Sequence, residues 1–227
     1  MLSIKDQIFN IKTKEEFNRL SLEVFKYQFL NNSVYNEFCT HLNISPNEIN
    51  SIEKIPFLPI EFFKTQAIKT GEFDAEQTFV SSGTTGANQS KHLVKDLTLY
   101  EMSYLEGFKQ FYGNVEDYCV LGLLPSYLER EGSSLIYMVE DLISKSKNSK
   151  SGFFLKNHKE LLGILTKNAQ KKQKTMLFGV SFALLDLAES YQVDLSDVII
   201  METGGMKGRR KELTRDELHS IYKKSFN

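Results

Sequence analysis

The sequence predicts an α/β protein in which a largely parallel sheet is flanked by helices and preceded by a helical N-terminal region. Beyond residue 115, short apolar segments alternate with segments of helical periodicity, which is the pattern of βαβ units. The near-continuous apolar run 118–124 is typical of a strand that is buried on both faces. The 227 residues, of which 41% are hydrophobic and 25% charged, have an ordinary globular composition and suffice for a large core.

We expect residues 1–75 to form the helical region and residues 76–227 to form the α/β core. The segment 13–16 has the pattern of a capping box, and apolar residues follow it on one helical face. The segment 45–48 is a second such pattern, with proline at the first helical position. The connector 55–64 is expected to be extended up to its second proline, because a residue that precedes proline avoids the helical conformation.

The elements expected in the core follow one another in the order of βαβ units. The expected strands are 77–80, 92–94, 118–124, 152–155, 175–180 and 198–201. The expected helices begin with a cap at Thr98, cover 134–143, 159–170 and 182–191, and end with a helix that a capping box at 214–217 opens.

Composition and charge exclude several classes of protein. Lys and Arg number 28 against 29 Asp and Glu, so the positive field of a nucleic-acid binder is absent. No stretch approaches the ~18 apolar residues of a membrane span, and the N-terminus lacks a signal-peptide pattern, so a cytoplasmic protein is predicted. Cys39 and Cys119 form no disulfide or zinc pattern, and the four histidines share no ligand spacing, so no metal-binding residues are predicted.

The strongest candidate site is the segment 81–86, which follows the expected strand 77–80. Its candidate phosphate ligands are Ser81, Ser82, Gly83, Thr84, Thr85 and Gly86. The glycines let backbone N–H groups approach a ligand closely, and the hydroxyls add donors, so the loop could enclose phosphate oxygens. Lys91 could place a cation on the same phosphates. From these residues alone a hydroxyl-rich surface turn remains equally open, and the spacing fits neither a Walker A loop nor the dinucleotide fingerprint.

A second candidate site is the segment 201–212, which leaves the expected strand 198–201. It should therefore lie at the carboxyl edge of the sheet, where open α/β sheets bind their ligands. Gly204 and Gly205 would let the backbone lie flat against a planar ring. Taken by itself, the cluster of cations at Lys207, Arg209, Arg210 and Lys211 favours a solvated loop over a binding site.

A third pattern, Gly-Val-Ser-Phe-Ala at 179–183, approximates the nucleophile elbow of α/β-hydrolases around Ser181. An aspartate and then His219 follow in the hydrolase order. However, alanine replaces the second glycine, and His219 falls inside an expected helix. We therefore interpret Ser181 as the N-cap of that helix and keep the hydrolase as an alternative.

Segment 79–86, Phe-Val-Ser-Ser-Gly-Thr-Thr-Gly, resembles the phosphate-binding signature of adenylate-forming enzymes. Within them the sequence is most similar to the acyl-protein synthetases of the bacterial bioluminescence fatty-acid reductase complex, with the phenylacetate–CoA ligases as more distant relatives. The stretches 55–65, 124–138 and 202–212 also resemble that synthetase group. The resemblance runs in order from about residue 55 to 217 and implies the fold of the N-terminal core of adenylate-forming enzymes.

The resemblance implies a ligase that uses ATP and Mg²⁺ to convert a carboxylic acid, in this group a fatty acid, to an acyl-adenylate, and then transfers the acyl group to a thiol. Ser82 to Gly86 would hold the phosphates with Lys91 nearby, so that Thr85 and Lys91 act in catalysis. Gly204 and Gly205 would lie along the adenine. Phe178, Gly179 and Ser181 would border the acyl pocket.

The chain departs from the family pattern at its end. The family continues to an aromatic-Gly-x-Thr-Glu motif, a ribose-binding Asp, a lid with a Lys and the acyl-accepting cysteine, whereas this sequence ends at Asn227. The resemblance therefore implies the N-terminal portion of a synthetase, with an acyltransferase, a reductase or a C-terminal chain as partner. A catalytically silent nucleotide-binding or partner subunit is the alternative.

Overall fold

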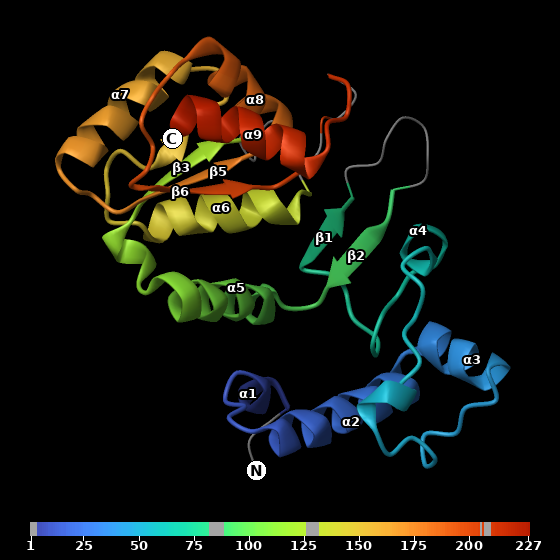
Figure 1. Cartoon of the computed structure of the whole chain (residues 1–227). Helices are drawn as coiled ribbons and strands as arrows, with labels where there is room; N and C mark the ends of the chain where they lie inside the picture. The colour runs from blue at the N-terminus through green and yellow to red at the C-terminus, as the bar shows by residue number, and fades with distance from the viewer. Residues whose placement is uncertain (1–3, 82–88, 126–131, 205, 207–209) are drawn as a thin grey trace. The chain divides into compact units, whose positions relative to one another are not determined.

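The computed structural model describes residues 4–81, 89–125, 132–204, 206 and 210–227 (Figure 1). Its contacts divide the chain into two compact units, Met1–Glu106 and Gly107–Asn227, and the division falls within one helix. Each unit is described by itself below. The boundary expected between residues 75 and 76 stays a prediction.

Helices dominate the start of the first unit. They are α1 (Ile4–Ile8), α2 (Lys14–Asn31), α3 (Ser33–His41), the 3-10 turn η1 (Ile52–Lys54) and the short α4 (Phe62–Thr65). The capping box of α2 is confirmed, because the Thr13 side chain accepts from the Glu16 N–H and the Glu16 carboxylate accepts from the Thr13 N–H. The helix expected at 45–48 is wrong: this segment forms a single turn, in which the Glu48 N–H donates to the Ser45 carbonyl at 3.0 Å.

A small aromatic core holds the helices of this unit together. Phe25, Tyr35, Cys39 and Ile49 are buried against one another, and the rings of Phe25 and Tyr35 meet edge to face. The Tyr35 hydroxyl donates to the Pro56 carbonyl at 2.6 Å. This bond ties the extended connector, whose conformation before α4 is as expected, to the helices.

The first unit also contains an antiparallel hairpin of β1 (Gln77–Val80) and β2 (Lys91–Val94), in which Val80 pairs with Lys91. Helix α5 (Leu97–Tyr112) follows and crosses the division between the units. It begins one residue before the expected cap at Thr98. The Asp96 carboxylate accepts from the Thr98 N–H at 2.9 Å, so Asp96 caps α5 and the prediction for Thr98 is wrong.

The second unit contains a parallel sheet, which confirms the predicted α/β class. Its strands are β3 (Cys119–Leu123), which follows the short turn η2 (Val115–Asp117), β4 (Gly152–Phe153), β5 (Thr175–Gly179) and β6 (Val198–Glu202). Among the described residues the strand order is β4-β3-β5-β6, and all pairs are parallel. Every residue of β3 and β5 is buried, as predicted for the run 118–124.

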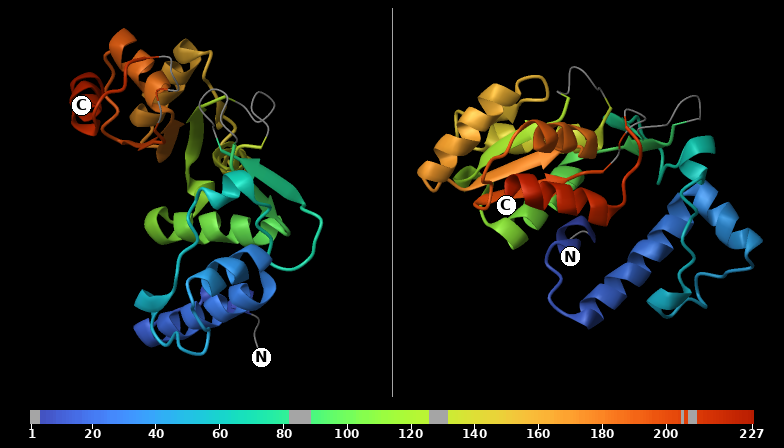
Figure 2. Two further views of the ribbon diagram at one scale, coloured as in Figure 1. Left: turned by 90° about the vertical axis from the view of Figure 1, so that its right-hand side faces the viewer. Right: turned by 45° about the horizontal axis from the view of Figure 1, so that its top comes forward.

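Helices cover both faces of this sheet. Helix α6 (Ser134–Lys145) lies on one face, and α7 (His158–Gln170) and α8 (Ser181–Ser190) lie on the other, with α9 (Arg215–Phe226) against α8 (Figures 1 and 2). Right-handed crossovers explain this arrangement, because a crossover that moves the other way along the sheet places its helix on the other face. The connection from β3 to β4 moves one way along the sheet, and the connections from β4 to β5 and from β5 to β6 move the opposite way. The direction therefore reverses between β3 and β5.

Buried and half-buried hydroxyl and amide groups form hydrogen bonds at the amino edge of the sheet. The Ser151 hydroxyl accepts from the Val120 N–H at 3.0 Å, and the Ser146 hydroxyl donates to the Tyr118 carbonyl at 2.7 Å. On the next strand, Asn168 donates to the Thr175 hydroxyl at 3.1 Å. Within the described ranges, no helix has the length and apolar character that a membrane crossing requires.

Candidate functional site

The topology points to the carboxyl edge of the parallel sheet as the place for a site. Open α/β sheets bind ligands outside the carboxyl ends of their strands, at the point where the strand order reverses. Here that point lies between β3 and β5, next to the start of α8. The predicted residues Gly179 and Ser181 lie at the carboxyl end of β5, and Gly204 follows β6.

A carboxylate at the end of β6 links these segments. The Ser181 hydroxyl donates to Oε1 of Glu202, and the Gly204 N–H donates to the same oxygen at 3.1 Å. Ser181 is 2% exposed, whereas Glu202 is exposed at the strand end. One oxygen therefore connects the buried first turn of α8 to the backbone that follows β6.

Backbone and phenol groups add further bonds around Ser181. The Thr203 N–H donates to the Gly179 carbonyl at 2.9 Å, which continues the pairing of β5 and β6 by one residue. The Tyr222 hydroxyl, from α9, donates to the Ser181 carbonyl at 3.1 Å. Burial, with a smaller contribution from the Glu202 charge, raises the pKa of the Tyr222 phenol, so Tyr222 stays a neutral donor at neutral pH.

The N-cap prediction for Ser181 is wrong. The N-cap position of α8 is Val180, which has no capping side chain, and Ser181 is the first helical residue. Its hydroxyl is directed to Glu202 and not to His219, which lies exposed on α9. The hydrolase alternative needs a serine that a histidine activates and a substrate can reach, and Ser181 is 2% exposed with its hydroxyl on Glu202, so the described residues give that alternative no support.

Phe178 and Gly179 are packed in the sheet interior. Phe178 is 4% exposed and pairs with Met201 of β6. A Cβ atom on Gly179 would lie 2.5 Å from Cγ of Leu184, so the missing side chain is what lets α8 approach β5. Their place beside an acyl pocket stays a prediction.

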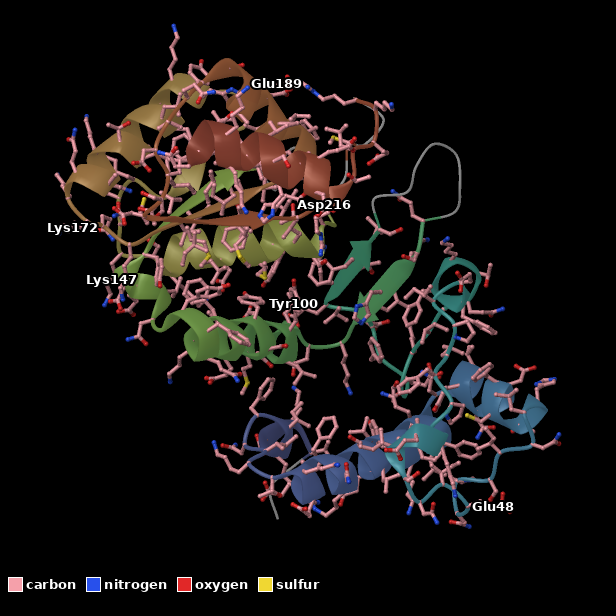
Figure 3. All side chains as sticks on the ribbon, viewed as in Figure 1. Glu48, Tyr100, Lys147, Lys172, Glu189 and Asp216 are labelled. Carbon is pink, nitrogen blue, oxygen red and sulfur yellow. The ribbon has the colours of Figure 1, made fainter. Side chains whose placement is uncertain are left out.

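Among the described residues beyond Gly204, Arg210 is anchored on α8. Met206 is 1% exposed, and the Arg210 guanidinium donates to both carboxylate oxygens of Glu189, at 2.9 and 2.8 Å, and to Asp186 (Figure 3 labels Glu189). Arg210, one of the predicted cations, is thus paired with two acidic residues. Gly205 and residues 207–209 lie outside the described residues.

The hairpin of the first unit holds Ser81, where the predicted phosphate segment 81–86 begins, against Ser90 on the returning side of the hairpin. The Ser81 N–H donates to the Ser90 carbonyl at 3.0 Å, and the Ser90 N–H donates to the Ser81 hydroxyl at 3.0 Å. Lys91 is exposed at the start of β2. The predicted residues Ser82, Gly83, Thr84, Thr85 and Gly86 lie outside the described residues.

The structure therefore brings together Gly179, Ser181 and Gly204, whereas Ser81 and Lys91 belong to the first unit and are described separately from them. Sequence reasoning missed Glu202 and Tyr222 as members of the cluster. An acidic residue that ends an otherwise apolar strand is the signal that could have identified Glu202; nothing local marks Tyr222. Among the described residues, no group of three or more His, Cys, Asp or Glu side chains could hold a metal ion.

Comparison with known proteins yields a partial match. Over 74 residues the chain is 32% identical to a long-chain-fatty-acid–luciferin-component ligase of Vibrio harveyi. The matched stretch is 32% of this chain and 19% of that ligase, so the chain covers much less than two thirds of the relative. No family model matches the chain. No solved structure matches it either.

Proposed function

We propose that the chain takes part in the ATP-dependent activation of a fatty acid, as the N-terminal part of an acyl-protein synthetase. A carboxylate oxygen of the acid would attack the α-phosphorus of ATP, and pyrophosphate would leave, which gives the acyl-adenylate. A cysteine thiol would then attack the acyl carbon and lose its proton, and AMP would leave. The observation that carries this proposal is the similarity to the Vibrio ligase, whose name states a long-chain fatty acid as its substrate.

Two features of the chain support the proposal. The sequence Ser-Ser-Gly-Thr-Thr-Gly at 81–86 opens the connection 81–90 between β1 and β2, and Lys91 begins the returning strand. Backbone N–H groups and a cation suit the charge that grows on phosphate oxygens in the transition state. In the second unit, Gly204 follows β6 at the carboxyl edge of a parallel sheet, where nucleotides bind in open α/β proteins.

The donor chemistry of the chain also fits ATP with its magnesium ion. Mg²⁺ would be held largely by the phosphates of ATP, as it is in sites that bind it by one or two carboxylates and the phosphates of the substrate. Bound there, the ion would neutralise phosphate charge. The acyl-accepting thiol would belong to a further segment or a partner chain, since both cysteines described here, Cys39 and Cys119, are buried.

Calorimetric titration with ATP and Mg²⁺ tests the proposal. We expect weak binding by the 227-residue chain, and loss of this binding in the double variant Thr85→Ala/Lys91→Ala. The reason is that the loss of one hydrogen bond to a charged group costs about 1.5–3 kcal/mol of binding free energy, which lowers the affinity about tenfold or more. The matched control is Lys95→Ala, which removes an exposed cation four residues further along and should leave binding unchanged.

Pyrophosphate exchange distinguishes an enzyme from a silent nucleotide binder. Exchange of labelled pyrophosphate into ATP that depends on added fatty acid would support the ligase, and nucleotide binding without any exchange would favour the silent subunit. Absence of binding at millimolar ATP would contradict the proposed site. An ATP affinity that is the same in the Thr85→Ala/Lys91→Ala variant as in the original chain would also contradict it.

A further inference from the structure

We infer that Glu202 is a positioning residue: its carboxylate fixes the Gly204 backbone against which the base of a bound nucleotide would lie. This inference rests on the proposed function and adds Glu202 to it, a residue that acts on the nucleotide through Gly204. The observation behind it is the pair of hydrogen bonds that one oxygen of Glu202 accepts, from the Ser181 hydroxyl and from the Gly204 N–H.

The first step of the argument is the conformation of Gly204. Its φ of +75° lies in the left-handed region, which a glycine adopts without strain, and a Cβ atom there would meet no atom of the described residues within 4 Å. A glycine in open space has many backbone conformations available, so something must select this one. The bond from its N–H back to the side chain two residues earlier makes that selection.

The second step is the anchoring of the carboxylate itself. Glu202 is exposed, and an exposed glutamate side chain is ordinarily mobile. Here the hydroxyl of Ser181, which is 2% exposed on the first turn of a buried helix, holds the carboxylate oxygen. Tyr222 in turn holds the Ser181 carbonyl from α9. Hydrogen bonds from the side chains of α8 and α9 therefore fix the position of Gly204 through Glu202. Hydrogen bonds to a charged acceptor such as this carboxylate are stronger than those between neutral groups.

Three variants separate this role from a general contribution to folding. Glu202→Ala removes the acceptor, and Ser181→Ala removes the hydroxyl that holds it. Glu202→Gln keeps a carbonyl oxygen that can accept both bonds. Glu212→Ala is the matched control, because it deletes an exposed carboxylate from the same connection between β6 and α9.

The experiment compares ATP with inorganic tripolyphosphate, both with Mg²⁺, in calorimetric titrations of the whole chain. We expect Glu202→Ala and Ser181→Ala to weaken ATP binding about tenfold and to leave tripolyphosphate binding unchanged, since tripolyphosphate has no base. Glu202→Gln should restore most of the ATP affinity, and Glu212→Ala should behave as the unmodified chain. Equal losses for both ligands, or no loss of ATP binding, would overturn the inference.

A second measurement needs no nucleotide. Amide hydrogen exchange of Gly204, followed by NMR, should accelerate in Glu202→Ala and Ser181→Ala and stay slow in Glu202→Gln. Unchanged exchange in the alanine variants would refute the positioning role even if ATP binds. If the unmodified chain binds neither ATP nor tripolyphosphate, the proposed function fails, while the exchange rates still decide whether Glu202 fixes Gly204.

Discussion

Replacing Gly179 by alanine tests the packing of α8 on β5. The added Cβ would lie 2.5, 2.8 and 2.9 Å from Cγ, Cδ2 and Cδ1 of Leu184, whereas ordinary contacts are 3.4–4 Å. Leu184 is fully buried, and its branch point is among the atoms in collision, so a simple rotation cannot relieve the overlap. We therefore expect the free energy of unfolding to fall by about 2–3 kcal/mol, toward the upper end of what overpacking costs.

Urea denaturation followed by circular dichroism measures this change, and Gly163→Ala is the control. Gly163 is exposed within α7, and no atom of the described part of the chain lies within 4 Å of an added Cβ, so alanine there should stabilise the chain by about 0.5–1 kcal/mol. The double variant Gly179→Ala/Leu184→Ala should be less destabilised than the sum of its parts, because the second change removes the collision. A Gly179→Ala chain as stable as the original would refute the packing argument.

The remaining predictions concern Asp96 and Thr214. The hydrogen bond from Lys5, followed by those from Thr98, lowers the pKa of Asp96 from 3.8 to about 2. The ionised Asp96 carboxylate therefore stabilises the fold fully above about pH 4, and this stabilisation is lost as the pH falls toward 2. The melting temperature of Asp96→Asn should therefore change less over this range than that of the original chain. Thr214→Ala removes the side chain that accepts from the Glu217 N–H and should cost about 1 kcal/mol in urea denaturation, while Thr214→Ser should cost little.

Elements set by local chemistry could be predicted from the sequence. The capping boxes that begin at Thr13 and Thr214 form as expected, because each is completed by a glutamate three residues later. The same pattern fails at 45–48, where the next residue, Ile49, packs into the core with Phe25 and ends the turn. Tertiary packing there overrides a local preference.

The candidate site was predictable only in part, because its bonds join residues far apart in sequence. The position of Gly204 after the expected strand 198–201 predicts it at the carboxyl edge, and the elbow pattern with the resemblance indicates Gly179; the parallel pairing of β5 and β6 does bring both glycines to one edge. The hydroxyl of Ser181 looked like a cap, but its acceptor is Glu202, 21 residues further along. No local pattern reports such a partner; only the register of the two strands does.

The hydroxyls at the amino edge of the sheet have a consequence for how the two edges tolerate mutation. Ser146, Ser151 and Thr175 are bonded to groups inside the fold, so replacing one leaves a buried partner unsatisfied. At the carboxyl edge the central acceptor is the exposed Glu202, and water can satisfy the exposed Gly204 N–H that the loss of Glu202 releases. Substitutions at the carboxyl edge of the sheet can therefore change ligand preference while the amino ends of β3 and β5 keep the domain folded.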